Sequence, residues 1–311
     1  MNNPNDNGPQ PSSGTQALEV RELVLRDADG RVGAKLDVGP SGPRLILYDA
    51  GGEARAALAV TADGALLDLC DANGKPRVGL AVRSDGAAID LLDASGNLRA
   101  AIHAGIDEPT VALFDASRTT RAQLALRADK PELALFDANG RPRADIFVGD
   151  APGFTLRDRA GKPRAAIVLT DDGPALALRE SGGNTCAFLS VTHDKPTLRL
   201  SDAAGKSRIG LTVVDDVTTL AVEDGGGKTR ASLGVTDGGT ALHLYDASGE
   251  PRVWLLVTDE GQSLELRGPA GPAIIIATPD PQNRPTGRKS KRAAANIHLF
   301  DHDGAVIWSA P

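Results

Sequence analysis

Apolar residues occupy every second position over short runs of the chain, and these runs recur along most of it. Leu133 and Leu135 precede the phrase DANG, and Ala144, Ile146 and Val148 follow it. A period of two over such short runs is typical of strands with one apolar face. We therefore expect an all-β protein whose strands each turn one aliphatic face to the same side.

The alternation belongs to a repeat marked by an acidic residue, a small residue and a glycine, as in DANG at Asp71 and DASG at Asp246. The marker positions are Asp27, Asp49, Asp71, Asp93, Asp115, Asp137, Asp158, Glu180, Asp202, Asp224, Asp246, Gly268 and Asp301. They are 22 residues apart, except for one step of 21 and a last step of 33. Each unit of such a repeat packs on its neighbours, so the array need not divide into separate domains.

Turn residues stand at both connections of each repeat. DANG at 71–74 and TADG at 61–64 both have Asp or Thr first and Gly fourth, which suits a type I turn followed by a left-handed residue, the G1-bulge hairpin. Hairpins at both ends make sequential strands antiparallel neighbours. The sequence thus predicts tandem 22-residue two-strand repeats that form an extended antiparallel meander.

Other repeat architectures share part of this pattern. A parallel two-sheet β-solenoid with one repeat per coil remains the alternative, because it would show the same alternation and regular turns. A propeller would need a rhythm of two repeats, and the prolines after the turn glycines do not follow one. A leucine-rich repeat would carry an asparagine ladder, which the sequence lacks.

An open meander leaves its aliphatic face without cover. The other face carries small residues such as Ala57, Ala59, Gly79 and Ala81, which indicate a solvated or lightly packed surface. Copies of the same sheet could pack their aliphatic stripes around a common axis, and we favour a homotrimer over a dimer. Self-coiling into a closed barrel or a two-layer roll is the alternative.

Composition narrows the partners and the location. A net charge of -7 gives no overall attraction to nucleic acid or anionic membranes. No run approaches the roughly 18 apolar residues of a membrane span, and the amino-terminal residues do not read as a secretory signal peptide. We expect a cytoplasmic protein or a part of a particle or fibre released by a non-Sec route. Cys70 and Cys186 lie five repeats apart and are expected to be free thiols.

Arginine follows the marker by six residues in nine repeats: Arg55, Arg77, Arg99, Arg121, Arg143, Arg164, Arg208, Arg230 and Arg252. Marker and arginine can face each other across a hairpin, so we expect repeated cross-turn salt bridges with a structural role. The Asp–Gly turns lack the later carboxylate of a calcium loop, and the five histidines are scattered over different repeats. With no phosphate loop or nucleophile elbow either, we expect no enzyme, cofactor or metal site.

One segment breaks the repeat and divides the chain. We expect a disordered polar arm at 1–17, the β-repeat array at 18–277, a basic proline-rich loop at 278–295 and a terminal hairpin cap at 296–311. The loop carries a candidate site for an anionic glycan or an acidic protein partner, formed by Arg284, Arg288, Lys289, Lys291 and Arg292. It has no interleaved aromatic residues, which disfavours nucleic acid.

The DAxG turn and its flanks, as in LYDASGEPR, resemble the YD-type hairpin repeats of bacterial toxin-encasing shells. The stacked hairpins also resemble the trimeric shafts of phage and injection-system tail fibres, over most of residues 18–277. The tyrosine of the shell repeats is present only at Tyr48 and Tyr245, so the fibre resemblance fits better. It implies a non-enzymatic structural or adhesive fibre or stalk, assembled as a homotrimer. A monomeric β-repeat module that binds a glycan or a protein is the alternative.

Overall fold

The computed structural model describes residues 18–105, 108–259, 261–268, 271–278, 296–301 and 305–310. These residues form β-strands and turns, and no helix occurs among them. The described part of the chain therefore contains no helix that is long and apolar enough to span a membrane. The all-β prediction is confirmed. The chain divides into two compact units, residues 1–120 and 121–311, which are described separately.

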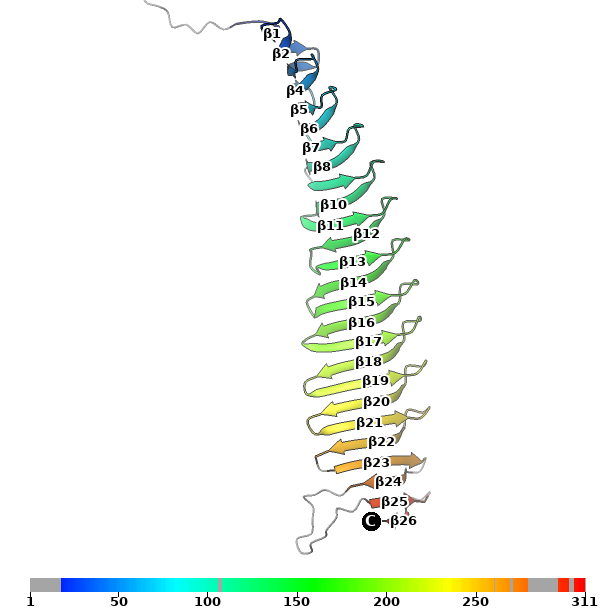
Figure 1. Ribbon diagram of the computed structural model, residues 1–311. Coiled ribbons are helices and arrows are strands. Elements are labelled where there is room, and N and C mark those ends of the chain that lie inside the picture. The colour runs from blue at the N-terminus through cyan, green and yellow to red at the C-terminus, as the bar shows by residue number, and fades with distance from the viewer. Residues whose placement is uncertain are drawn as a thin grey trace, which may run out of the picture. The chain divides into compact units, whose positions relative to one another are not determined.

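The first unit contains nine described strands, coloured blue to green in Figure 1. They are β1 (Glu22–Arg26), β2 (Val32–Gly39), β3 (Gly42–Tyr48), β4 (Ala54–Thr61), β5 (Gly64–Cys70), β6 (Pro76–Arg83), β7 (Gly86–Leu92), β8 (Leu98–Gly105) and β9 (Thr110–Phe114). Each pairs antiparallel with the next strand in the chain.

The second unit continues the same pattern, with its first strand beginning at the boundary residue. Its described strands are β10 (Thr120–Arg127), β11 (Lys130–Phe136), β12 (Pro142–Phe147), β13 (Gly153–Arg157), β14 (Pro163–Thr170), β15 (Gly173–Arg179), β16 (Thr185–Thr192), β17 (Lys195–Ser201), β18 (Ser207–Val214), β19 (Val217–Glu223), β20 (Thr229–Thr236), β21 (Gly239–Tyr245), β22 (Pro251–Thr258), β23 (Gly261–Gly268), β24 (Gly271–Ala277), β25 (Asn296–Phe300) and β26 (Val306–Ala310). Sequential strands again pair antiparallel.

The order of strands decides between the two predicted architectures. Within each unit the arrows of Figure 1 alternate in direction from one strand to the next. A solenoid would instead pair equivalent strands of successive coils in parallel. The antiparallel meander is therefore confirmed, and the parallel β-solenoid is wrong for the described strands.

The turns that begin with the marker aspartate have the predicted geometry. In the turn after β5, the Gly74 N–H donates to the Asp71 carbonyl at 3.0 Å, and the Asp71 N–H donates to the Lys75 carbonyl at 2.8 Å. Gly74 has a φ of 73°, and the pairing of β5 with β6 shifts register between Leu69 and Cys70. These are the features of a type I turn closed by a G1 bulge.

The turns at the opposite edge differ from the prediction. Thr61 pairs directly with Gly64, so Ala62 and Asp63 alone form the loop, and no bulge follows. Gly64 has a φ of 135°, and a Cβ placed on it would overlap the carbonyl oxygen of Val82 in the following hairpin. The glycine of TADG is thus required by the close approach of the neighbouring repeat, whereas the glycine of DANG closes its own bulge.

The single 21-residue step is accommodated in a loop. Phe147 at the end of β12 pairs with Gly153 at the start of β13, so residues 148–152 replace the two-residue connection found at other repeats. Strands β12 and β13 are correspondingly short, with 6 and 5 residues. After the loop, the apolar residues still project to the same side of the sheet, since Leu156 lies directly opposite Ala144.

Candidate functional site

An uninterrupted row of large apolar residues crosses the second unit, one from each strand from β10 to β25. Because directly paired residues project to the same side of a sheet, the register places these residues in one row. The row is Leu124, Leu133, Ile146, Phe154, Ile167, Leu176, Leu189, Leu198, Leu211, Leu220, Leu233, Leu242, Leu255, Leu264, Ile276 and Ile297. We call the side that carries it the aliphatic face.

The first unit has a corresponding row on its own aliphatic face. It consists of Leu23, Leu36, Leu45, Leu58, Leu67, Leu80, Ile89, Ile102 and Val111. A second row beside it alternates larger residues with alanine, as in Leu47, Ala56 and Leu69. Neither row contains a charged residue in the strands that the structure describes.

Much of the aliphatic face is exposed. Ile167 is 53% exposed and Leu189 is 47% exposed, whereas Leu176 between them is half-buried. Residues of this size are ordinarily among the most buried in folded proteins, and monomers rarely show contiguous apolar patches beyond a few hundred Å². A row of this length with such exposure is therefore unusual for a monomer.

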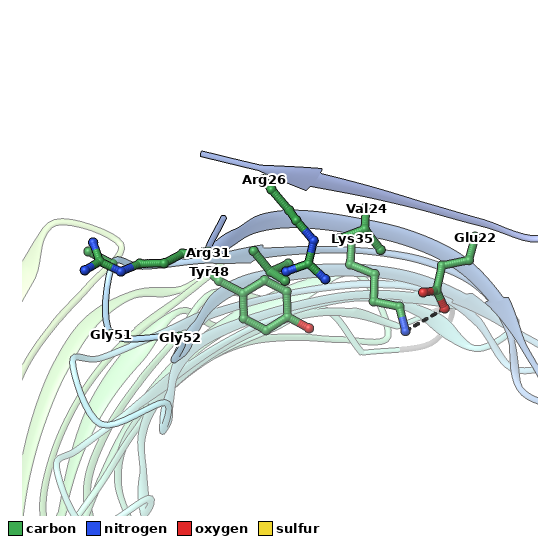
Figure 2. A pocket seen from close by; sticks show the side chains of 10 residues that line it. Glu22, Val24, Arg26, Arg31, Lys35, Tyr48, Gly51 and Gly52 are labelled. Carbon is green, nitrogen blue, oxygen red and sulfur yellow. Dashed lines mark ion pairs between the residues drawn. The ribbon is translucent and has the colours of Figure 1, made fainter. Parts of the chain in front are cut away.

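The opposite face holds the most buried side chains among the described residues, which corrects the expectation of a lightly packed surface. Ala101 is 3% exposed and Ala134 is 4% exposed. In the first unit, Figure 2 shows the strands bowed, with Lys35 and Tyr48 on the inner side of the bow. Small side chains fit on an inner side, where neighbours converge, and the larger side chains around them shield them from water. We call this side the inner face.

Ion pairs on the inner face neutralise its buried carboxylates. Asp37 is 7% exposed and lies 2.7 Å from Arg44 Nε and 3.0 Å from Lys35 Nζ. Hydrogen bonds from Arg44 first, and from Lys35, lower the pKa of Asp37 to about 2. Asp145, also buried, pairs with Arg157 at 2.7 Å. Because a charge without a partner would be costly at such positions, these pairs stabilise the fold.

Eight of the nine predicted salt bridges across the marker turns are confirmed. Their nitrogen–oxygen distances range from 2.6 Å, for Arg252 with Asp246, to 3.6 Å, for Arg77 with Asp71. The pairs are Arg55–Asp49, Arg77–Asp71, Arg99–Asp93, Arg143–Asp137, Arg164–Asp158, Arg208–Asp202, Arg230–Asp224 and Arg252–Asp246. These arginines have partners in their own turns, which is consistent with a structural role.

The same arginines make a second contact that the sequence did not reveal. Arg55 Nε donates to the Cys70 carbonyl at 3.2 Å, and Arg164 Nε donates to the Arg179 carbonyl at 2.7 Å. Each accepting carbonyl belongs to the residue directly before the next marker. The arginine therefore links two successive marker turns. The only available signal was the constancy of its spacing from the marker.

Each marker aspartate also organises its own turn. Asp71 Oδ1 accepts the backbone N–H groups of Asn73 at 2.9 Å and Lys75 at 3.2 Å. These bonds, that of Asn73 above all, together with the Arg77 charge lower the pKa of Asp71 below 3.8. The ionised carboxylate is thus part of the folded turn.

A pocket of about 590 Å³ lies on the inner face at β1–β3 (Figure 2). Lys35 points toward Glu22 and pairs with its Oε2 at 2.9 Å. Arg26 Nη1 donates to the Gly30 carbonyl at 2.8 Å, and Arg31 pairs with Asp29 at 3.3 Å. Lys35 and Arg31 are thus ion-paired, whereas Arg26 is held by a backbone carbonyl.

A second cleft, of about 560 Å³, lies on the inner face of the second unit and differs in its lining. It is surrounded by hydroxyl side chains, one tyrosine ring and one lysine. The residues are Thr219, Ala221, Lys228, Thr229, Ser232, Tyr245, Ser248 and Gly249. Ser232 Oγ and the Tyr245 hydroxyl are 3.1 Å apart.

Several residues considered in the sequence have no place in these surfaces. The amino-terminal arm and the proposed anionic-partner residues Arg284, Arg288, Lys289, Lys291 and Arg292 lie outside the described residues. Within the described part of the chain, no three His, Cys, Asp or Glu residues are grouped as a metal site would require. Cys70 and Cys186 are free thiols, as predicted.

Comparisons with known proteins do not identify a family. No protein-family model matches the chain, and no curated protein does. The solved structure "Crystal Structure of TcdB2-TccC3" is similar at 11% identity with a TM-score of 0.19, covering 91% of this chain and 20% of that chain, so this chain spans about a fifth of its length. "Crystal structure of the eukaryotic initiation factor" is similar at 10% identity with a TM-score of 0.17, covering 94% and 96% of the two chains. The order and pairing of its strands show that the chain is an antiparallel β-repeat protein.

Proposed function

We propose that this β-repeat chain is a non-enzymatic structural protein, a fibre or stalk, whose copies assemble as a homotrimer through the aliphatic face. The observation that carries the proposal is the exposed aliphatic row. Fully burying a leucine is worth about 1.5–3 kcal/mol, so covering the 47% of Leu135 that is exposed would add about 0.7–1.4 kcal/mol. Summed over a row of such residues, this gain is large enough to drive association.

The regular spacing of the row favours a second copy of the chain as the covering partner. Neighbouring strands are about 4.8 Å apart, so the row presents one apolar side chain per strand at that interval. A partner that fills the gaps between these side chains needs the same interval along its own surface. An identical sheet supplies it without further adjustment.

The bowing of the strands favours three copies over two. In the first unit, the aliphatic face is on the outer side of the bow, opposite Lys35 and Tyr48 (Figure 2). Two outward-curved surfaces touch along a narrow strip, so the apolar rows on either side of that strip stay exposed to water. Three such surfaces around one axis give each sheet two neighbours, one for each flank.

The test is the mass of the chain in solution, by light scattering, and its dependence on the aliphatic face. We expect three times the chain mass of 32.1 kDa for the unaltered protein. The double variant Leu135→Asp, Leu200→Asp should give the mass of one chain, because carboxylates cannot be buried in an apolar interface. Arg199→Asp is the matched control, since it places the same residue next to Leu200 on the inner face and should leave the trimer intact.

A mass of one chain for the unaltered protein would overturn the trimer and favour the monomeric binding module. A trimer that survives both leucine substitutions would overturn the assignment of the interface to the aliphatic face.

A further inference from the structure

The cleft on the inner face of the second unit lies over a row of paired residues in which small side chains follow one another. Gly210, Ala221 and Ser232 are successive members of this row, and Ala221 and Ser232 line the cleft. Arg199 precedes them in that row, and its guanidinium lies 5.3 Å from the ring centroid of Phe188. His243 follows them and contacts Trp254 edge to face, with ring centroids 5.2 Å apart.

The chemistry of the cleft is that of a hydroxyl-rich surface beside an aromatic ring. Thr219, Thr229, Ser232 and Ser248 supply hydroxyl groups, which can both donate and accept hydrogen bonds. The Ser248 hydroxyl already donates to Asp246 Oδ1, and the Ser232 hydroxyl is hydrogen-bonded to that of Tyr245. The hydroxyls of Thr219 and Thr229 make no hydrogen bond to another described residue. Tyr245 adds an aromatic ring together with a hydroxyl of its own.

The charges around the cleft exclude other ligand classes. Its lining contains no carboxylate, so it would not hold a cation. Its single cation, Lys228, already donates to the Ala247 carbonyl at 3.0 Å, which is too little charge for a polyanion. The polar lining also makes it unsuitable for a purely apolar ligand.

From this lining we propose that the cleft binds a neutral saccharide. A sugar ring presents hydroxyls that donate and accept, and its C–H groups form an apolar side that can lie against an aromatic ring. The cleft volume of about 560 Å³ falls in the usual range for small-ligand sites. The lining comes mainly from β-strands, which hold it in place. The proposal does not depend on assembly, because the cleft and the aliphatic face are on opposite sides of the sheet.

The two tyrosines of the chain allow a sharp test. Tyr48 and Tyr245 occupy the same position in their repeats, but Tyr48 lines the pocket at β1–β3 and not this cleft. The full chain, labelled with 3-fluorotyrosine, should give one fluorine NMR resonance for each tyrosine. The resonance that is lost in the variant Tyr48→Phe belongs to Tyr48. We would titrate it with cello-, malto-, manno- and galacto-oligosaccharides, and with heparin as an acidic probe.

We expect at least one neutral oligosaccharide to shift the Tyr245 resonance and leave that of Tyr48 in place. Thr219→Val should weaken this binding between about two- and tenfold, because it removes one hydroxyl at nearly constant shape. Thr212→Val is the matched control, since Thr212 lies directly opposite Thr219 on the same face but does not line the cleft. It should leave the affinity unchanged.

Three results of the titration would overturn the proposal. They are no shift with any neutral oligosaccharide, equal shifts of both tyrosines, and a shift of Tyr245 with heparin alone. Equal weakening by Thr219→Val and Thr212→Val would equally reject the cleft as the binding site. None of these outcomes bears on the mass measurement, so this proposal and that of the trimer fail separately.

Discussion

Replacing Gly64 by alanine should disrupt the packing of one repeat on the next. Gly64 begins β5, and a Cβ there would overlap the carbonyl oxygen of Val82 in β6. Gly52 offers a matched control, because it too has a positive φ, of 86°, but an added Cβ would have nothing within 4 Å. Both variants therefore place alanine at a positive φ, 135° at Gly64 and 86° at Gly52, and Gly64→Ala adds a steric contact that Gly52→Ala lacks.

The size of the difference follows from these two contributions. Alanine in a left-handed conformation costs about 1–2 kcal/mol, which is the whole effect expected for Gly52→Ala. Gly64→Ala must in addition move a backbone carbonyl of a paired strand, and crowding of this kind costs about 1–3 kcal/mol. We therefore expect a loss of about 2–5 kcal/mol in the free energy of unfolding for Gly64→Ala.

The assay is urea unfolding followed by circular dichroism, at one chain concentration for all variants so that assembly contributes equally. Gly86→Ala should reproduce the effect of Gly64→Ala, because its Cβ would overlap the carbonyl oxygen of Ala104 in the same way. Equal losses for Gly52→Ala and Gly64→Ala would refute the reasoning that the close approach of the next repeat requires glycine.

Three further predictions concern the turns and the thiols. The folded chain lowers the pKa of six marker aspartates below 3.8, namely Asp49, Asp71, Asp93, Asp137, Asp202 and Asp224. Their ionised carboxylates therefore stabilise the fold above pH 3.8, and the melting temperature should fall as the pH drops through the folded pKa values. A constant melting temperature on acidification would contradict this. Arg252→Lys should lower the free energy of unfolding by about 1 kcal/mol, because lysine cannot hold Asp246 and the Gly268 carbonyl together, and urea unfolding would measure the loss. Burial raises the pKa of the Cys70 thiol, so iodoacetamide should modify Cys70 more slowly than a cysteine in an unfolded peptide, as peptide mass spectrometry would show.

The sequence predicts those features that arise within one hairpin. Asp71 and Gly74 determine their turn through local hydrogen bonds and a left-handed glycine, and the alternation at Leu133 and Leu135 assigns the aliphatic face. These interactions span few residues, so their residue types are visible as a short pattern. The cross-turn pair of Arg252 with Asp246 belongs to the same class.

Features that depend on the next repeat were not predictable in this way. The role of Gly64 arises from the carbonyl of Val82, far along the chain in the paired strand, and the burial of Ala101 arises from the side chains around it and from the inner side on which it lies. The cleft needs Ala221 and Ser232 to lie side by side, which only the register between strands decides. A signal did exist, because these residues follow one another at intervals of eleven, half the repeat length.

The loop at 148–152 shows how the array can vary in length. A repeat of 22 residues contains an even number of positions, so a whole repeat can be gained or lost while every other residue keeps its side of the sheet. A change of a single residue within a strand would instead turn the aliphatic residues beyond it inward, and at the 21-residue step the chain avoids this by confining the change to a connection. Genetic duplication or deletion of complete repeats would thus lengthen or shorten the aliphatic face by two strands at a time, and the remaining residues would keep their sides of the sheet.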